Sequence, residues 1–279
     1  MTLIYSTPNI FHEFIRSKLV WRGLKLFFGN NSFLNELKKE AILSEAKKIR
    51  SDHFQKLTVK NGPFKGMVYP EWNSRGSMLL PKLFGTYENE LWDVIEKIKS
   101  NKYAEIIDIG CAEGYYAIGF ARIFPSSKIV ACDIDKKSRE LCKRMAKANQ
   151  VEDRVLVSGK FSLNDLKLID HYSRNLIISD CEGFENELFT EEALDHLINS
   201  DLIIETHDFI IPGTLEKLSQ LFSQTHHLEI ISTLNEEEKL TKVPLPELKS
   251  YLPYIRRRLI SEQRPGTMYW LALFSKNNY

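Results

Sequence analysis

The fold of this chain is decided by one stretch near its middle, Glu105-Ile106-Ile107-Asp108-Ile109-Gly110-Cys111-Ala112-Glu113-Gly114-Tyr115-Tyr116. The apolar run 103–109 predicts a short buried strand, and residues 114–122 have the apolar content of a helix that ends before Pro125. The loop between them is bracketed by two glycines. Gly110 can adopt a positive φ, and Gly114 leaves the N–H groups of the helix start open to an anion or a carboxylate. The stretch therefore predicts a nucleotide site at the end of a parallel sheet.

The spacing of the glycines indicates which class of ligand the loop binds. A pyrophosphate needs the crowded G-x-G-x-x-G turn, whereas this loop is spaced G-x-x-x-G beside Asp108, which suits a ligand with an amino group and a ribose. A second predicted strand, residues 128–133, ends in Asp133, at the place where such folds bind ribose hydroxyls. We predict ribose binding for Asp133 and capping of helix 136–149 for Asp135. The alternative is that both acids only start the helix.

The layout acid-x-Gly-x-x-x-Gly resembles the first motif of class I S-adenosylmethionine-dependent methyltransferases. The resemblance implies S-adenosyl-L-methionine as the cofactor. After a third predicted strand, residues 154–158, Phe161 either lies against the adenine or belongs to the core. The expected cofactor-binding residues are Asp108, Gly110, Cys111, Ala112, Gly114, Tyr115, Asp133, Ile134, Gly159, Lys160, Phe161 and Asp180.

The rest of the chain continues the alternation of strands and helices. Further strands are predicted at 175–180, 201–206, 228–233 and 268–274, and helices at 191–199 and 215–223. This pattern predicts an α/β fold, a doubly wound, seven-stranded Rossmann-like sheet with right-handed crossovers. The resemblance to methyltransferases implies that the last strand is antiparallel.

The N-terminal part is predicted to be a helical extension. Residues 10–28 and 33–50 carry apolar residues at helical spacing, and the first of these segments is also rich in Lys and Arg. A basic amphipathic helix can lie on an anionic membrane surface, but a helix packed on its own domain gives the same pattern more often. We expect packing rather than membrane contact.

The segment before the first sheet strand is predicted to border the site. Residues 57–69 contain two β-like runs around Asn61-Gly62, which predicts a small β-hairpin, and Thr86 is the expected cap of the helix that follows. We therefore expect three parts: a helical extension over 1–56, the hairpin and bordering helix over 57–100, and the methyltransferase domain over 101–279.

Composition limits the partners and the compartment. The formal net charge is +1 and no long basic run occurs, so we predict no nucleic-acid partner. The four cysteines lack paired C-x-x-C spacing and are expected to be reduced thiols. The first residues do not resemble a signal peptide, and no apolar run is long enough to span a membrane, so the cytoplasm is expected.

Polar side chains follow the fourth and fifth predicted strands. Ligands of doubly wound sheets bind outside the carboxyl ends of the strands, so Asp180 and His207 should face the reactive end of the cofactor. An alcohol acceptor loses its proton as it attacks, which calls for a general base or for a metal that acidifies the hydroxyl. We choose His207 as the base, with Asp180 as the second catalytic residue. The alternative for His207 is a strand-end residue bonded to backbone.

Residues 177–185 resemble the I-D-V-E-G-x-E signature of the FkbM-type methyltransferases. The match holds at Asp180, Glu182, Gly183 and Glu185, and it fails at Ser179 and Cys181. The resemblance implies O-methylation of a sugar or a secondary metabolite. Methylation of amino groups on bases commonly uses an Asn/Asp-Pro-Pro-aromatic loop at this place, which the chain lacks.

We expect a small-molecule or glycan acceptor, bound by Tyr87, Glu182, Asp208 and Arg264. Carboxylates at adjacent strand ends could alternatively hold magnesium or calcium, but their spacing selects no ion, and we predict no metal. Two rival functions are a non-catalytic scaffold with this fold and a nucleotide-dependent oxidoreductase. The glycine spacing disfavours the oxidoreductase. The oligomeric state is not predicted.

Overall fold

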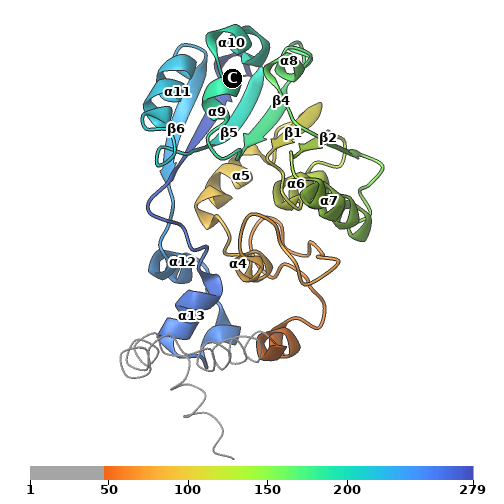
Figure 1. The fold of residues 1–279 in the computed structure, drawn as a ribbon, viewed down its shortest axis with the longest axis vertical. Coiled ribbons are helices and arrows are strands. Elements are labelled where there is room, and N and C mark those ends of the chain that lie inside the picture. The colour runs from red at the N-terminus through yellow and green to blue at the C-terminus, as the bar shows by residue number, and fades with distance from the viewer. Residues whose placement is uncertain (1–46, 279) are drawn as a thin grey trace, which may run out of the picture. The chain divides into compact units, whose positions relative to one another are not determined.

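The computed structural model describes residues 47–278 (Figure 1). The chain divides into two compact units between residues 56 and 57, and each is described by itself. Residues 47–53 of the first unit are helical. The predicted helix 10–28, most of the helix 33–50 and the question of membrane contact lie outside the described residues. Within residues 47–278, no helix has both the length and the apolar character that crossing a membrane requires.

The second unit is built on one seven-stranded mixed sheet, as predicted, with the strand order β3-β2-β1-β4-β5-β7-β6. The first five strands are parallel, and β7 runs antiparallel between β5 and β6. The strands are β1 (Glu105–Ile109), β2 (Lys128–Cys132), β3 (Val155–Ser158), β4 (Asn175–Ser179), β5 (Ser200–Thr206), β6 (His226–Ser232) and β7 (Tyr269–Ser275).

Helices connect and cover these strands. The α-helices are α4 (Leu79–Phe84), α5 (Trp92–Ile98), α6 (Tyr115–Ile123), α7 (Lys136–Ala148), α8 (Leu163–Leu166), α9 (Glu185–Leu188), α10 (Glu191–Leu197), α11 (Thr214–Phe222), α12 (Glu236–Lys242) and α13 (Pro253–Ile260). Short 3₁₀ turns are η1 (Asn89–Leu91), η2 (Pro246–Leu248) and η3 (Lys276–Asn278). Figure 1 shows α4, α12 and α13 gathered below the sheet.

Burial explains why each strand has its sequence. The central strands β4 and β5 are buried at every position, and their middle residues are apolar, whereas polar residues stand at their ends. The edge strands β3 and β6 carry exposed residues among buried ones. One face of the sheet packs on α9, α10 and α11 through a cluster that includes Ile107, Ile109, Ile177, Leu202, Ile204, Leu188, Leu197, Leu218 and Phe222.

The strand register places the site. Ile109 pairs with Cys132 on one side and with Ser179 on the other, and Ser179 pairs in turn with Ile204. The residues that follow these four positions therefore emerge along a single edge of the sheet. Ligands of doubly wound sheets bind at this carboxyl edge.

Two local predictions differ from the structure. The expected hairpin over 57–69 is reduced to one antiparallel bridge, between Thr58 and Val68, because the turn between the two runs is long. Thr86 caps no helix, and its hydroxyl donates instead to the carbonyl oxygen of Pro81. The 3₁₀ turn η1 leads directly into α5, whose N-terminus has no side-chain cap.

Candidate active site

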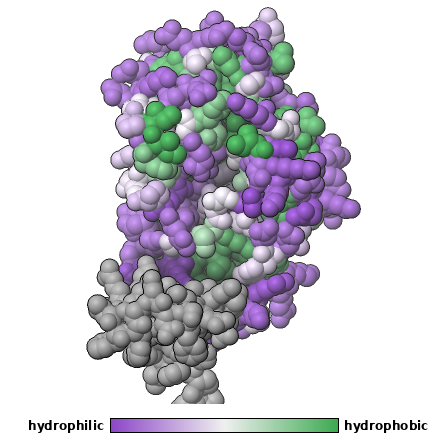
Figure 2. Space-filling view, viewed as in Figure 1, coloured by the Kyte–Doolittle hydropathy of each residue, from purple (hydrophilic) through white to green (hydrophobic). Residues whose placement is uncertain are grey.

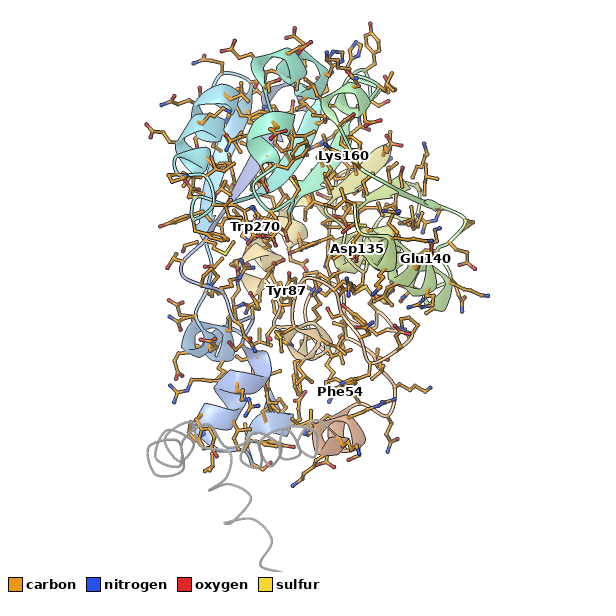
Figure 3. All side chains as sticks on the ribbon, viewed as in Figure 1. Phe54, Tyr87, Asp135, Glu140, Lys160 and Trp270 are labelled. Atoms are coloured by element: carbon orange, nitrogen blue, oxygen red, sulfur yellow. The ribbon has the colours of Figure 1, made fainter. Side chains whose placement is uncertain are left out.

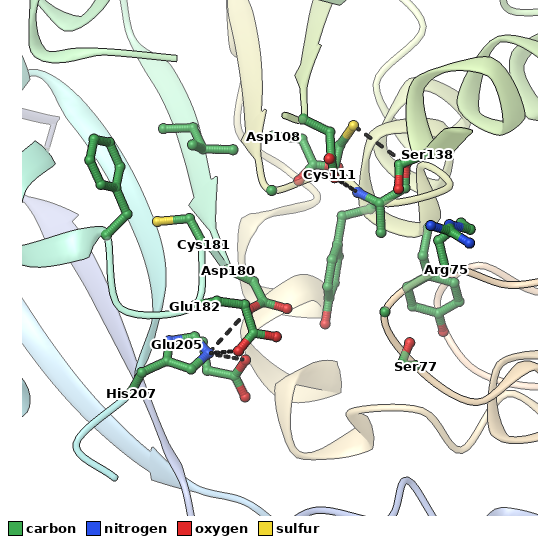
Figure 4. Close-up of a pocket in the computed structure, with 18 of the residues that line it drawn as sticks. Arg75, Ser77, Asp108, Cys111, Ser138, Asp180, Cys181, Glu182, Glu205 and His207 are labelled. Atoms are coloured by element: carbon green, nitrogen blue, oxygen red, sulfur yellow. Dashed lines mark hydrogen bonds and ion pairs between the residues drawn. The ribbon is translucent and has the colours of Figure 1, made fainter. Parts of the chain in front are cut away.

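A cavity of about 760 Å³ lies at the carboxyl edge of the sheet. Figure 2 shows a largely hydrophilic face hollowed near its middle, and Figure 4 shows the cavity wall. The predicted residues that line it are Asp108, Gly110, Cys111, Ala112, Tyr115, Asp133, Ile134, Gly159, Lys160, Phe161, Asp180, Tyr87, Glu182, His207 and Arg264. Two predicted residues, Gly114 and Asp208, do not line it.

The loop after β1 is held by backbone hydrogen bonds. The N–H groups of Gly110 and Cys111 both donate to the carbonyl oxygen of Cys132, 2.9 Å away in each case. Gly110 has φ +83°, and Ala112, which is not a glycine, has φ +48°. The N–H of Ala112 donates to Asp133 at 2.8 Å. These contacts join the ends of β1 and β2 into one wall of the cavity.

Asp108 is buried at the base of this wall. One of its oxygens accepts the N–H of Ala117 at 2.8 Å, so the carboxyl group caps the first turn of α6. Burial raises the pKa of Asp108 to about 8, and the hydrogen bond from Ala117 offsets only part of that effect. Asp180 and Asp133 raise this pKa further by charge repulsion.

This pKa predicts how stability changes with pH. The folded pKa of Asp108 lies above the ordinary value of 3.8, so the folded chain keeps a proton that the unfolded chain releases. The contribution is complete below about pH 4 and is lost as the pH rises through about 8. We expect Asp108→Asn, which cannot titrate, to flatten the fall in unfolding free energy between pH 5 and pH 8, measured by urea unfolding. The exposed Asp195→Asn is the control, and equal slopes in wild type and Asp108→Asn would contradict the prediction.

Asp133 and Asp135 have different contacts in the structure. Asp135 caps α7 by accepting the N–H groups of Lys137 and Ser138, which confirms the predicted cap. Asp133 accepts the N–H of Asp135 at 2.7 Å and that of Ala112, and it faces the cavity. Its predicted bond to ribose stays a prediction. Phe161 lines the cavity and also belongs to the hydrophobic core, and its contact with adenine stays a prediction.

A buried charge cluster that the sequence did not reveal closes the cavity from the side of α4. Lys82 and Glu113 form an ion pair of 2.5 Å, with side-chain exposures of 2% and 0%. Glu113 also accepts bonds from Tyr69, from Ser74 and from the N–H of Arg75. The one signal in the sequence is a charged residue inside the glycine-bracketed loop.

His207 is buried at the other end of the cavity, 1% exposed, among carboxylates. Its Nδ1 lies 2.9 Å from Oε1 of Glu185. Its Nε2 lies 3.4 Å from Oδ1 of Asp180 and 3.6 Å from Oε2 of Glu205. Oε2 of Glu182 is 3.7 Å away (Figure 4). The structure thus brings together the two residues predicted to be catalytic.

The charge of His207 differs from the expectation. Burial opposes a positive imidazole, but the hydrogen bonds and charges of Asp180 and Glu185 outweigh it and raise the pKa of His207 to about 10. A base that titrates near neutrality was expected. The carboxylates on both sides keep the proton on the imidazole, so His207 does not fit that role as it stands.

Arg264 also differs from its predicted role of gripping an anionic acceptor. Its guanidinium donates to Glu205, to Glu88 at 2.7 Å and to Glu262 at 2.7 Å. All three carboxylates are nearly inaccessible. Burial raises the pKa of Glu88 to about 7, although Arg264 lowers it. The arginine therefore neutralises buried glutamates, two of which, Glu88 and Glu262, had no signal in the sequence.

The other three residues predicted to bind the acceptor lie in different places: Glu182 and Tyr87 line the cavity, and Asp208 does not. Glu182 is 73% exposed at the mouth of the cavity. Tyr87 is buried, and Figure 3 places it between the sheet and α4. Asp208 accepts the N–H of Leu215 at 3.3 Å and so belongs to the start of α11 rather than to the cavity. Gly114 lies against the thiol of Cys142, behind the wall.

Residues 93–179 match the family model described as the methyltransferase small domain. The match spans β1 to β4 and so covers the cofactor half of the cavity. It agrees with the resemblance drawn from the first loop.

Two curated relatives are named for RNA. The tRNA1(Val) (adenine(37)-N6)-methyltransferase of Porphyromonas gingivalis is 26% identical over 175 residues, 57% of this chain and 65% of that protein. The ribosomal RNA small subunit methyltransferase C of Escherichia coli is 33% identical over 58 residues, 21% of this chain and 17% of that protein. The chain thus spans less than two thirds of either protein.

These relatives contradict the prediction that nucleic acid is not a partner, and we correct it. That prediction used the net charge of the whole chain. A sum over all residues does not describe the local field of one cleft, which is what an acceptor meets.

Among solved structures, the O-methyltransferase from Bacillus cereus, in complex with SAH, has a TM-score of 0.45 and 14% identity, covering 68% of this chain and 81% of that one. The strand order, the glycine-bracketed loop, the acid after β2 and the matched family model converge on one conclusion. Residues 93–179 are similar to the methyltransferase small domain, and S-adenosylmethionine is the cofactor.

Proposed function

We propose that this chain transfers the methyl group of S-adenosylmethionine to an oxygen of a small molecule or a glycan. The observation that carries the proposal is a single cavity lined both by Asp108 and Asp133 at one end and by Asp180, Glu205 and His207 at the other. The cofactor supplies an electrophilic methyl group on sulfur. The resemblance of residues 177–185 to the FkbM signature supports an oxygen as the acceptor atom.

The first end of the cavity fits the cofactor. Gly110 lines the cavity, and a Cβ there would lie 1.8 Å from the carbonyl oxygen of Asp180, so only glycine lets the loop after β1 come this close to the end of β4. Asp133 presents a carboxylate for ribose hydroxyls. Ile134, 79% exposed and yet lining the cavity, and Phe161 offer apolar surface to an adenine.

The second end fits a hydroxyl group. Carboxylates accept hydrogen bonds from hydroxyls, and Asp180 and Glu205 present them beside His207. Holding the oxygen in line with the methyl group can supply roughly 7–11 kcal/mol through proximity and orientation. As the C–O bond forms and the C–S bond breaks, the hydroxyl proton passes to this carboxylate cluster.

The test is an acceptor panel with a labelled methyl donor and the full chain. The panel holds sugars, phenolic and aliphatic alcohols, amines and transfer RNA, and calorimetry first compares S-adenosylmethionine with NAD. Label in an alcohol or a glycan is the expected result. Label found only in amines would contradict the choice of oxygen as the acceptor atom. Cofactor binding without transfer to any acceptor would favour the non-catalytic scaffold.

A second candidate is methylation of RNA, which the similarity to the Porphyromonas gingivalis protein favours over 57% of this chain. The transfer RNA in the panel decides it. Label in that RNA, with none in the alcohols or glycans, replaces the first candidate by the second.

His207→Ala tests the acceptor end. We expect transfer to fall about 10²–10⁴-fold, the range for loss of proton-transfer assistance, because the charged imidazole holds the Asp180 and Glu205 carboxylates that accept the hydroxyl proton, while calorimetry still detects the cofactor. The matched control is His227→Ala, an exposed position on β6 outside the cavity wall, which should keep wild-type turnover. Unaltered transfer in His207→Ala would remove His207 from the mechanism.

A further inference from the structure

The three carboxylate oxygens around Nε2 of His207 are too far from it for good hydrogen bonds. They lie 3.4 Å, 3.6 Å and 3.7 Å away, on Asp180, Glu205 and Glu182. A strong charged hydrogen bond measures about 2.7–2.9 Å. Atoms that share one cation, with bonds of about 2.0–2.2 Å, stand about 3.0–3.5 Å from one another. The distance to Asp180 falls in this range, and the distances to Glu205 and Glu182 exceed it by 0.1 and 0.2 Å, so all three are nearer to the spacing of ligands than to that of a strong hydrogen bond.

Asp180, Glu205 and His207 each direct one ligand atom to the same point. These three atoms lie within 4.8 Å of one another. The atoms come from the ends of two adjacent parallel strands, β4 and β5, whose register fixes their separation. Figure 4 shows the carboxylates gathered on one side of the imidazole. Both strands lie inside the sheet and pair with a neighbour on each side, which holds their ends in register.

The other ring nitrogen of His207, Nδ1, is fixed by a hydrogen bond. Nδ1 bonds Oε1 of Glu185, a carboxylate with 0% exposure, so the ring is oriented with Nε2 toward the cluster. Ligating histidines typically carry such a carboxylate on their other nitrogen. The proton of the metal-free imidazole leaves when a cation binds, because a ligating imidazole is neutral.

The polar atoms at this point have only long contacts with one another. The imidazole of His207 is 1% exposed, yet its Nε2 has only the long contacts given above. Oδ1 of Asp180 is enclosed, and Nε2 of His207, 3.4 Å away, is too distant to satisfy it with a good hydrogen bond. A buried carboxylate oxygen without a close partner is costly. Glu205 divides its oxygens, one bonded to Arg264 and the other turned to His207.

We propose that Asp180, Glu205 and His207 form a binding site for a divalent transition-metal ion, with Glu182 as a further ligand from the cavity mouth. One imidazole among carboxylates suits manganese, iron or zinc better than calcium or magnesium. The ion faces the cavity, so the acceptor oxygen can join its ligands. This role in acceptor binding rests on the proposed methyl transfer, whereas the metal site itself does not.

The experiment measures metal binding without any turnover. The full chain is stripped with a chelator and titrated with Mn²⁺, and free Mn²⁺ is followed by electron paramagnetic resonance. We expect one Mn²⁺ per chain, and at least a tenfold weaker affinity in Asp180→Asn and in His207→Gln. Glu187→Gln, an exposed acid on α9 outside the cavity wall, is the matched control and should bind as wild type does.

Each outcome bears on the proposal. No Mn²⁺ binding by the wild type, or equal affinity in all variants, overturns the site. A visible spectrum of wild-type chain loaded with Co²⁺ reports nitrogen and oxygen ligands even if the variants do not fold. Mn²⁺ binding together with equal transfer by stripped and loaded chain keeps the site and overturns its role in acceptor binding. Metal binding without transfer to any acceptor refutes the proposed function alone.

Discussion

Replacing Gly110 by Ala is expected to abolish cofactor binding and to destabilise the chain. The new Cβ would lie 1.8 Å from the carbonyl oxygen of Asp180, and φ is +83°. The left-handed backbone costs about 1–2 kcal/mol for a residue with a Cβ. Overpacking adds about 1–3 kcal/mol, and here the neighbour is backbone that cannot rotate away. Relief requires β1 and β4 to separate at the edge that carries both ends of the cavity.

Gly213→Ala separates collision from backbone strain. Gly213 has φ +86°, close to that of Gly110, but a Cβ there meets nothing within 4 Å, and the residue lies outside the cavity wall. We expect this control to lose only the stability that the left-handed backbone costs a residue with a Cβ, and to bind the cofactor normally. Urea unfolding and calorimetry with S-adenosylmethionine measure both variants. Equal losses in the two would show that strain, rather than the contact with Asp180, is the cause.

Arg264→Met is expected to destabilise the chain by about 3–5 kcal/mol at neutral pH, because it leaves buried carboxylates uncompensated. Glu88, Glu205 and Glu262 would lose their shared cation, although Lys239 still pairs with Glu262. The effect should weaken in acid. The pKa of Glu88 already lies at about 7, above its ordinary 4.5, and loss of Arg264 raises it further. A raised carboxyl pKa removes stability as the pH rises, so the deficit grows from pH 5 to pH 8.

The control for Arg264→Met is Arg257→Met on α13. Arg257 pairs with Glu237 at 2.8 Å, with side-chain exposures of 48% and 66%. Exposed pairs contribute about 0–1 kcal/mol, so little change is expected. Urea unfolding at pH 5 and pH 8 gives both comparisons. A deficit for Arg264→Met that does not depend on pH would contradict the assignment of buried, titrating glutamates.

The fold follows from local features of the sequence. The seven strands were each predicted to within about two residues, because each is a short apolar run bounded by polar or turn residues. Helix α7 was predicted with its cap, since Asp135 needs only the neighbouring N–H groups of Lys137 and Ser138. Thr86 failed as a cap because the chain approaches α5 through the turn η1, which a pattern of apolar spacing does not reveal.

The candidate site could be predicted from the sequence only in part. The edge of the sheet could be predicted, because residues after parallel strands share one edge, and this brought Asp108, Asp133, Asp180 and His207 to one cavity. The environment of each side chain could not be predicted from the sequence. The pKa of His207 depends on Glu185, and the role of Arg264 depends on Glu88, which lies 176 residues away in the chain.

The sequence by itself determined the sheet and the glycine-bracketed loop, because strands, turns and caps depend on neighbours along the chain, and the resemblance of that loop to a known motif implied the cofactor. Only the tertiary structure decided the charge of His207, the pairing of Arg264 with three glutamates and the convergence of Asp180 and Glu205 on one nitrogen. The physical reason is that burial and Coulomb interactions depend on distances in space. Segments far apart in sequence set those distances.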